Sequence, residues 1–459
     1  MQTMAVSLEP EWRSADDIEQ LQLGLLRSMI DACALRHPWY SKVLAECGIE
    51  GADLESLEDL ERVPLTTKQT FIDNADQFRL EADPVRSEDY VLADVTYTAG
   101  TSTGTPTPIF QTSYDLRAVL FAQRRMMTLR GVTRRDRVMN LYPLAPFPHG
   151  GWIRPTQAAA SLGAPVVAAT GGSRHHRFPV TRTMSEIIDL VVETNPTIVW
   201  GVPSYVERVL SHVVEGKRSL PALRMIAVSG EPCSEARRDS MIELARSAGS
   251  RSPFVSDSLG ASELQFSLVE CPGGRGFHHP APELAHIDVV DDSGKSVADG
   301  TPGRLTYTHL DRTGTVLLRF LVGDRAVLDR SPCPTCGWAG GRVTEHLGRE
   351  GNLRKIRGAL VNIDAVHHAI ENSEGVVGHR LEITLESGVD RLQAFVATDS
   401  ASDDAVVVAS VVDSVRRATG VRLEVTTATR EEIWSPDEEL KPVRFKDLRA
   451  RESDGRSSK

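Results

Sequence analysis

Apolar residues recur with helical spacing in two early parts of the chain. Residues 17–45 carry this spacing up to a Pro-Trp-Tyr break, and "YDLRAVLFAQRRMMTLRGV" carries it up to Gly131. Apolar positions three and four residues apart lie on one face of a helix. Both segments are therefore predicted to be amphipathic helices.

The middle of the chain alternates between short apolar runs and amphipathic segments. Four strand–helix units follow one another with short connections, which favours an α/β sheet covered by helices. The predicted strands are residues 138–144, 164–170, 197–202 and 222–230, and the predicted helices are residues 153–163, 183–195, 203–216 and 234–249.

Beyond residue 280 the pattern becomes β-rich, with Asp-Gly-type turns between alternating runs. A new α/β unit follows it, beginning with "RLEITLES". The glycine- and charge-rich segment from Gly348 to Gly358 lies between the two patterns. It predicts a domain boundary, with a large domain of residues 1–347 and a small domain of residues 348–459.

Composition limits the classes of partner. The chain has 459 residues and a net charge of -11, which disfavours nucleic acid and anionic membranes as partners. It contains no apolar run of membrane-spanning length, and its first residues are acidic without a signal-like apolar core, so we expect a cytoplasmic protein. Its six cysteines do not form a disulfide framework in such a compartment.

The stretch from Tyr97 to Pro108, "YTAGTSTGTPTP", is rich in glycine and hydroxyl side chains and follows a strand-like segment. Two interpretations are open. One is an ordinary turn, and the other is a phosphate-binding loop in which backbone N–H groups and hydroxyls surround an anion.

Three cysteines and one histidine have the spacing of a metal site. Cys271 and His278 are seven residues apart, and Cys333 and Cys336 form a C-x2-C pair. Thiolate and imidazole ligands suit tetrahedral zinc. Four protein ligands would leave no coordination position open for a substrate, so the metal would be structural. The alternatives are cysteines that merely pack and a site that uses His279 instead of His278.

Six segments occur in one order along most of the chain: the glycine-rich loop, "SGEPCSE", "SLGASELQ", "LLRFLVGDRAVL", "GREGNLRKIRG" and "PDEELKPVRFKDLR". Together they resemble the adenylate-forming superfamily of acyl- and aryl-CoA ligases, and within it the phenylacetate-CoA ligase branch. The resemblance implies a large N-terminal domain of helix-covered sheets with a β-rich subdomain. It also implies a small, mobile α+β C-terminal domain that carries a catalytic lysine.

The resemblance assigns a role to each motif. It implies a catalytic role for Lys441, with Lys446 in reserve and Arg444 as the arginine that follows, and Mg²⁺ binding for Glu263. It implies ribose binding for Asp324 and a place in the interdomain hinge for Arg349. The remaining ATP-binding residues that it implies are Thr98, Gly100, Thr101, Ser102, Thr103 and Gly104 at the phosphates, Ser229, Gly230, Glu231 and Pro232 at the adenine, and Ser258, Gly260 and Ser262 beside Glu263.

The chain departs from the family pattern at a few of these positions. Thr105 stands where a lysine is common, and Leu259 replaces a tyrosine. Gly351 and Asn352 stand where two aspartates are usual. These departures indicate a divergent member.

The implied reaction is ATP-dependent activation of a carboxylic acid to an acyl-adenylate, followed by transfer to a thiol, with CoA as the expected acceptor. A carrier-protein thiol and an amine are alternative acceptors. Phe147, His149 and Trp152 could form a slot for an aryl acid, or they could be core aromatics. Homodimers are common in the branch.

Two other classes of protein remain open. A degenerate homologue would bind nucleotide without catalysis. An unrelated, metal-stabilised α/β interaction protein would bind zinc and no nucleotide.

Overall fold

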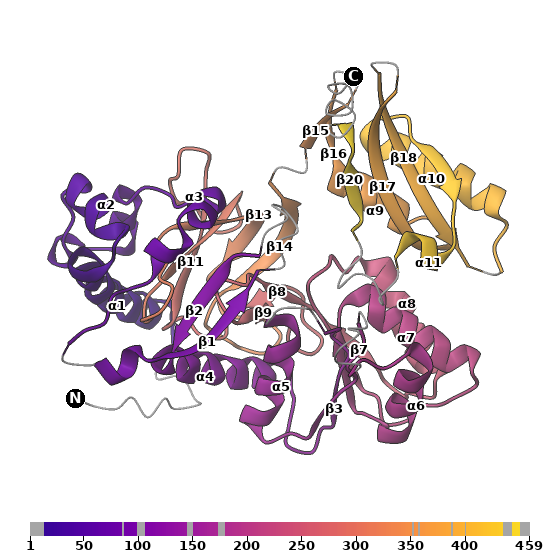
Figure 1. The fold of residues 1–459 in the computed structure, drawn as a ribbon, viewed down its shortest axis with the longest axis horizontal. Helices are drawn as coiled ribbons and strands as arrows, with labels where there is room; N and C mark the ends of the chain where they lie inside the picture. The colour runs from indigo at the N-terminus through magenta and orange to yellow at the C-terminus, as the bar shows by residue number, and fades with distance from the viewer. Residues whose placement is uncertain are drawn as a thin grey trace, which may run out of the picture.

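The computed structural model of the chain has a large lobe and a smaller C-terminal lobe, shown in gold in Figure 1. Three hydrophobic clusters form the interior of the described residues. Two lie mainly in the large lobe, one of which also takes in Ile433 and Trp434 of the small lobe, and the third lies in the small lobe. The structure describes residues 13–84, 87–98, 106–144, 150–172, 180–350, 353–356, 359–386, 389–399, 401–434 and 443–449.

The N-terminal region is helical, as its apolar spacing predicted. The predicted helix is two helices, α1 (Ala15–Arg36) and α2 (Tyr40–Cys47), and Ser14 and Asp17 form a capping box at the start of α1. The remaining helical turns of this region are η1 (Gly51–Asp53), η2 (Leu57–Arg62), α3 (Lys68–Asp73), η3 (Ala75–Phe78) and η4 (Ser87–Tyr90).

An antiparallel hairpin follows, made of β1 (Leu92–Tyr97) and β2 (Pro108–Thr112). The second predicted amphipathic helix is α4 (Ser113–Leu129), which begins directly after β2. Thr112 caps α4 in a capping box with Asp115, so the direction in which the chain leaves the hairpin is fixed.

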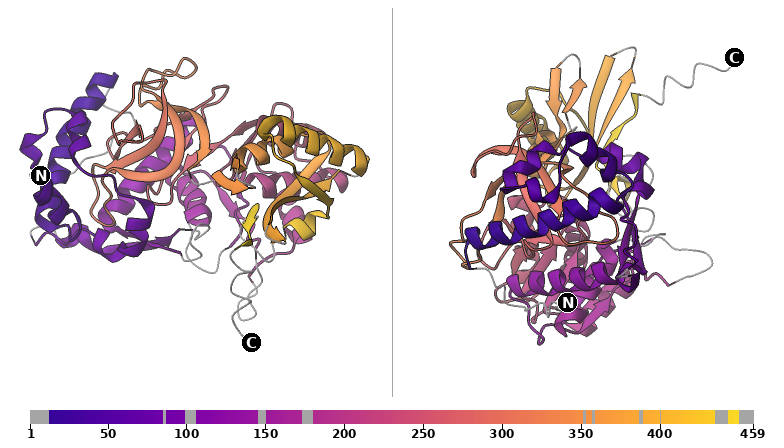
Figure 2. Two further views of the ribbon diagram at one scale, coloured as in Figure 1. Left: turned by 90° about the horizontal axis from the view of Figure 1, so that it is seen from above. Right: turned by 90° about the vertical axis from the view of Figure 1, so that its left-hand side faces the viewer.

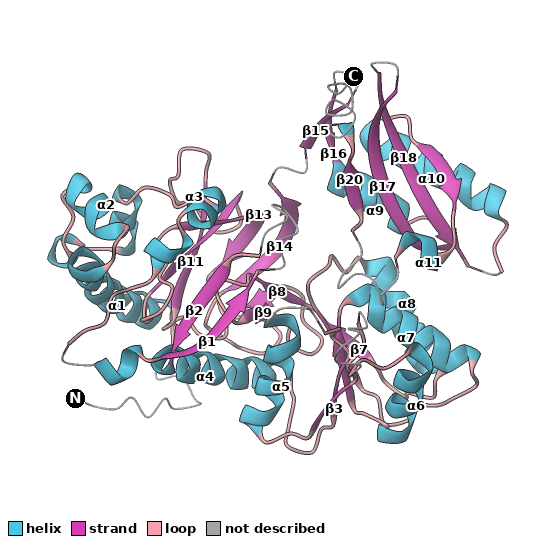
Figure 3. Ribbon diagram, viewed as in Figure 1, coloured by secondary structure: helices cyan, strands magenta, loops and turns pink. Residues whose placement is uncertain are grey.

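The four predicted strand–helix units and a further strand, β7, form a five-stranded parallel sheet in the order β4-β3-β5-β6-β7. Figure 3 shows its helices in cyan beside the sheet. The apolar side chains of both layers form one hydrophobic cluster. The units are β3 (Val138–Asn140), α5 (Gly150–Leu162), β4 (Val166–Ala168), α6 (Met184–Thr194), β5 (Ile198–Gly201), α7 (Pro203–Glu215), β6 (Met225–Val228), α8 (Glu235–Ser247) and β7 (Phe254–Ser256).

The β-rich region is a seven-stranded antiparallel sheet in the order β11-β12-β13-β14-β10-β9-β8. It packs against α1, α2 and the hairpin through the second hydrophobic cluster. Its strands are β8 (Ser258–Gly260), β9 (Ser267–Val269), β10 (Phe277–His278), β11 (Ala285–Val290), β12 (Pro302–His309), β13 (Phe320–Asp329) and β14 (Arg342–Arg349).

The small lobe contains a four-stranded sheet in the order β19-β18-β17-β20, and α9 and α10 pack against each other beside it. A two-stranded ribbon of β15 and β16 connects it to the large lobe. Its elements are β15 (Leu353–Ile356), β16 (Ala359–Asn362), α9 (Ile363–Glu371), β17 (Val376–Glu386), β18 (Val389–Thr398), α10 (Asp404–Thr419), β19 (Glu424–Thr427), α11 (Arg430–Ile433) and β20 (Phe445–Asp447).

The small lobe lies over the helices of the parallel sheet, as Figure 1 and both views of Figure 2 show. Ile433 and Trp434 bury their side chains in the hydrophobic cluster of the parallel sheet, and the Trp434 ring lies edge-on to that of Tyr205 in α7. Among the described residues, no helix has the length and apolar character needed to cross a bilayer.

Candidate functional site

Three loops meet at the carboxyl edge of the parallel sheet. Ser229 follows β6, Ser258 follows β7 and Tyr142 lies just beyond β3. Ser258 Oγ donates to the carbonyl of Val228 at 3.0 Å, and the Tyr142 hydroxyl donates to the carbonyl of Ser229 at 3.2 Å. Ligands of open α/β sheets bind outside this edge. The first nucleotide motif (residues 229–235) and the second nucleotide motif (residues 258–265) therefore lie where a ligand would be expected.

Buried charged side chains contact the segment that follows β7. Arg130 is fully buried, contacts Ser258 Oγ, and its guanidinium lies 4.9 Å from the centre of the Trp200 ring. Burial and the nearby carboxylate of Glu270 raise the pKa of Asp257 to about 7. The loop after β7 is thus held by a network of charges that water does not reach.

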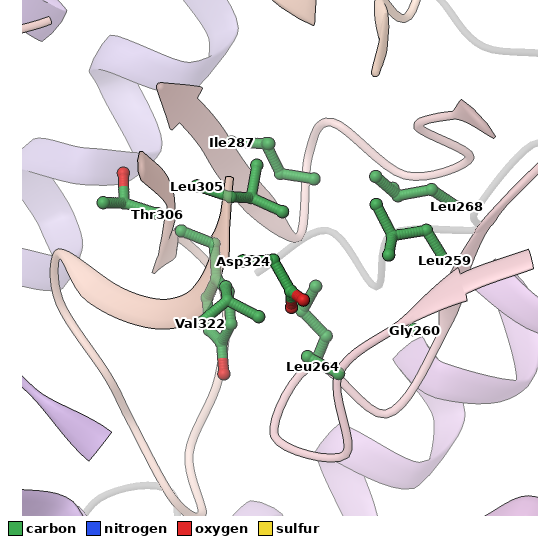
Figure 4. A pocket seen from close by; sticks show the side chains of 11 residues that line it. Leu259, Gly260, Leu264, Leu268, Ile287, Leu305, Thr306, Val322 and Asp324 are labelled. Carbon is green, nitrogen blue, oxygen red and sulfur yellow. The ribbon is translucent and has the colours of Figure 1, made fainter. Parts of the chain in front are cut away.

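Asp324 projects from β13 toward the second nucleotide motif. Its carboxylate lines a small cavity of about 20 Å³ together with Leu259, Gly260 and Val322 (Figure 4). This cavity has room for a water molecule and not for a nucleotide. The convergence itself is informative, because Gly260 and Asp324 belong to different motifs and lie 64 residues apart in sequence.

The charge of Asp324 is set by two neighbours on β14. His346 Nε2 lies 3.0 Å from Asp324 Oδ1, and Arg349 Nε lies 3.4 Å from the same oxygen. Burial raises the pKa of the carboxyl, but the hydrogen bond with His346 and the charge of Arg349 outweigh burial and hold that pKa below its ordinary value. Asp324 is therefore an ionised acceptor at neutral pH.

Glu263 is a buried carboxylate with an unpartnered oxygen. Its side chain is 4% exposed, and its Oε1 has no hydrogen-bond partner among the described residues. Such an oxygen costs free energy unless a cation or a donor completes it, and hard cations such as Mg²⁺ prefer carboxylate oxygens. Arg312 holds the Glu263 backbone by donating to its carbonyl at 3.4 Å, and Ser262 in the same turn accepts from Gln265. The residues present fit a magnesium site.

The structure places only the stem of the predicted phosphate loop. Thr98 N donates to the carbonyl of Thr107, and Thr107 N donates to Thr98 Oγ1, both at 3.0 Å. Gly100, Thr101, Ser102, Thr103 and Gly104 lie outside the described residues.

Phe147, His149 and Lys441 also lie outside the described residues. Trp152 is half-buried in α5 and packs against the cluster of the parallel sheet, while its carbonyl accepts from Asn140 Nδ2 at 2.9 Å. This position leaves both the substrate and the core interpretation of Trp152 open.

Sequence reasoning missed the ionic partners of the first nucleotide motif. Glu231 accepts from Ser204 Oγ at 2.9 Å and lies 3.5 Å from Arg444, while Gly230 before it has a φ of +88° that favours glycine. Pro232 follows and leads into α8. No local pattern marks these partners, because Arg444 belongs to the other lobe.

The four predicted metal ligands come together. The ligand atoms of Cys271, His278, Cys333 and Cys336 all lie within 4.8 Å of one another. His278 Nδ1 lies 3.0 Å from the Val269 carbonyl, which leaves Nε2 facing the thiols. A ring nitrogen fixed in this way is the usual arrangement of a metal-binding histidine. The donor set and its closeness fit tetrahedral zinc.

His279 is not available for this cluster. Its Nε2 lies 2.8 Å from the Ala285 carbonyl, and its Nδ1 accepts from Ala281 N at 3.3 Å. Gly274 leaves space for the cluster, since a Cβ at that position would lie 2.5 Å from Cys271 Sγ. The geometry therefore favours His278 over His279.

Comparison with known proteins identifies the class. The model of the AMP-binding enzyme family matches residues 42–309, more than half of the chain. The chain belongs to this family. The prediction of an AMP-forming ligase from the adenylate-forming superfamily, similar to phenylacetate-CoA ligases, is confirmed.

Curated relatives and solved structures agree with this class. The phenylacetate-coenzyme A ligase of Thermus thermophilus is 28% identical over 400 residues, which cover 84% of this chain and 82% of that protein. That of Escherichia coli is 24% identical over 407 residues, 86% of each chain. A structure of 2-hydroxyisobutyryl-CoA ligase in the postadenylation state has a TM-score of 0.79 at 23% identity, covering 100% of this chain and 97% of the other. The predicted fold class is thereby confirmed.

Proposed function

We propose that the protein activates a carboxylic acid with ATP to give an acyl-adenylate and pyrophosphate, and then transfers the acyl group to the thiol of CoA, releasing AMP. The observation that carries this proposal is the convergence of Asp324 with Leu259 and Gly260, in the segment whose Ser258 bonds to the end of β6 at the edge of the parallel sheet. The phenylacetate-coenzyme A ligases among the relatives support the choice of CoA.

The described residues divide the work of binding ATP. Asp324 is ionised and accepts hydrogen bonds from the ribose hydroxyls. Glu263 offers its free oxygen to Mg²⁺, which neutralises phosphate charge when it is bound. The loop from Thr98 to Gly104 would supply N–H and hydroxyl donors to the phosphates.

Charge stabilisation drives the first half-reaction. A carboxylate oxygen of the acid attacks the α-phosphorus, and the bond to pyrophosphate breaks. We assign to Lys441 the neutralisation of charge that develops on the reacting oxygens, since an ammonium group on a flexible side chain can follow them. Positioning and electrostatics supply most of the catalysis in reactions of this type.

For the acid, we propose an aryl acid such as phenylacetate. Phe147 and His149 precede α5 in the sequence and Trp152 lies in its first turn, and flat aromatic side chains favour a flat ring. The named activity of the curated relatives points the same way. A short hydroxy acid is the competing substrate, as in the structural neighbour.

We propose that residues 1–347 and 348–459 are two domains that rearrange between the half-reactions. The TM-score is 0.79 against 2-hydroxyisobutyryl-CoA ligase in its postadenylation state and 0.65 against the same enzyme in its thioesterification state. This difference supports assigning the present arrangement to the adenylation side of the cycle. The glycine-rich connection from Gly348 onward suits a hinge, and Gly348 has a φ of +90°.

We also propose that Cys271, His278, Cys333 and Cys336 hold a structural zinc ion. The cluster joins the β9–β10 and β13–β14 connections, so the metal would brace the antiparallel sheet. All four ligands come from the protein, which leaves no coordination position for substrate.

The test is product formation from ATP, CoA and a panel of acids, read by mass spectrometry. We expect acyl-CoA and AMP with an aryl acid, and a loss of about 100-fold or more in Lys441→Ala, as for the removal of one stabilising charge in a transition state. Lys446→Ala distinguishes the two candidate lysines and should keep its activity if Lys441 has the catalytic role.

Other outcomes would overturn part of the proposal. Acyl-adenylate without acyl-CoA would reject CoA and point to a carrier-protein thiol or an amine. ATP binding without any product would indicate a degenerate homologue.

A further inference from the structure

Four charged side chains join the two lobes beside the nucleotide motif. Arg237 lies in α8 and Glu231 in the loop before it, whereas Glu371 ends α9 and Arg444 precedes β20 in the small lobe. We name these four residues the interdomain clamp. Arg444 Nη1 contacts Glu371 Oε1, and Arg444 Nη2 lies 3.5 Å from Glu231 Oε2. Arg237 Nη1 lies 3.6 Å from the same oxygen of Glu371.

The clamp is largely excluded from water. Its side chains are between 5% and 13% exposed. Burial raises the pKa of Glu371, but Arg444 and Arg237 outweigh burial and hold that pKa below its ordinary value. Glu371 is therefore charged at neutral pH. A buried charge that loses its partner is strongly unfavourable, so the clamp is sensitive to the relative position of the lobes.

Each side of the clamp is fixed to its own lobe. Glu231 accepts from Ser204 N at 3.2 Å and from Ser204 Oγ at 2.9 Å, at the start of α7. Arg237 Nε, in α8, lies 3.3 Å from the carboxylate of Glu207, which is in α7. In the small lobe, the backbone of Arg444 accepts from Leu381 N at 2.7 Å in β17. Movement of the small lobe therefore acts directly on Glu231.

A purely structural interpretation explains less of this geometry. Glu231 belongs to the loop in which Ser229 contacts Tyr142 at the ligand edge of the sheet. Another ion pair between the lobes, Arg208 with Glu431, is different, since the Glu431 side chain is 67% exposed. Exposed pairs of this kind contribute little to stability. The buried clamp is the one located at the nucleotide motif.

We propose that Glu231, Glu371 and Arg444 are positioning residues that couple the small lobe to the nucleotide-binding loop and favour the arrangement used for acid adenylation. The inference rests on the proposed function and adds to it the residues that hold the small lobe in place for one half-reaction. Glu371 is its centre, because both arginines share one of its oxygens. When the lobes separate for acyl transfer, the four charges would return to water.

The experiment measures the two half-reactions separately in Glu371→Gln. Adenylation is followed as ATP–pyrophosphate exchange with the acid that the wild type activates, and acyl transfer as CoA-thioester formation from supplied acyl-adenylate. We expect kcat/KM for exchange to fall by about tenfold, a usual size for coupling between sites. Acyl transfer should stay at or above the wild-type rate. Equal losses in both half-reactions, or no loss in exchange, would overturn the proposal.

Two amide variants serve as matched controls. Asp189→Asn removes an exposed pair with Arg218 inside the large lobe, and Glu431→Gln removes the exposed pair between the lobes. Both should keep exchange within about twofold of wild type. Glu231→Gln, Arg444→Gln and their double variant form a cycle, in which the double variant should lose little more than either single one. Additive losses would contradict direct coupling.

A readout without activity separates this inference from the proposed function. Hydrogen exchange of the amides in α8 and α9 should be faster in Glu371→Gln than in Asp189→Asn, because the lobes separate more often. If wild type activates no acid, the proposed function fails while this comparison still tests the clamp. Equal exchange rates in the two variants would overturn the clamp.

Discussion

At the scale of single residues, the site shows how neighbours decide the state of a carboxylate. Asp324 and Asp257 are both buried, at 5% and 7% exposure. Asp324 stays ionised because His346 and Arg349 face it, whereas burial and the neighbouring Glu270 raise the pKa of Asp257 and favour its protonated form. The first carboxylate can accept hydrogen bonds from a ligand, and the second is a neutral or charged group according to pH.

Replacing Asp257 with asparagine should change how stability depends on pH. The pKa of Asp257 is about 7 in the folded protein, against 3.8 for an ordinary aspartate. The folded protein therefore keeps a proton that the unfolded chain has lost, and this group destabilises the fold as pH rises from about 4 to 7. Asparagine does not titrate and can still accept from Ser258 N.

Thermal unfolding at about pH 5 and about pH 8 tests this expectation. The midpoint of Asp257→Asn relative to wild type should become more favourable at the higher pH, whereas Asp189→Asn, on an exposed helix face, should show no such trend. A difference that is constant or reversed with pH would show that Asp257 is ionised throughout.

At the scale of elements, the apolar periodicity of the sequence predicted most of the helices and strands of the parallel sheet. The four strand–helix units of the parallel sheet are present because each pairs a short apolar run with an amphipathic segment. The order of the strands could not be predicted, since the short apolar runs of β3, an interior strand, and β4, an edge strand, do not show which strand each pairs with. Contacts distant in sequence could not be predicted either, as for Arg319, which donates to the backbone carbonyls of Glu61 and Val63.

The metal cluster makes a prediction at the same scale. Cys333→Ser should lower bound zinc from about one equivalent to near zero and lower the thermal midpoint by several degrees, because metal binding contributes to folding. Cys47→Ser is the matched control, a partly buried thiol outside the cluster. Adenylation at low temperature should remain, since the proposed metal is structural. Full retention of zinc in Cys333→Ser, measured by elemental analysis, would exclude this ligand set.

At the scale of the whole molecule, the sequence predicted a large and a small lobe, but not how the small lobe contacts the large one. The glycine-rich segment from Gly348 to Gly358 lies where the β-rich sheet ends and the small lobe begins. The contacts between the lobes had no signature, because Arg237 and Glu371 are ordinary charged residues on amphipathic helices. The placement of the small lobe makes Glu231 a contact between lobes as well as a part of the nucleotide motif.

The most direct test of the central claim is ATP–pyrophosphate exchange across aryl acids and short hydroxy acids, for wild type and Asp324→Asn. Exchange should require an acid, and the variant should raise the KM for ATP by about tenfold, as expected for losing a charged hydrogen-bond acceptor. Exchange with an aryl acid would establish adenylation and name the substrate. ATP binding without exchange for any of these acids, or an unchanged KM in Asp324→Asn, would contradict the account.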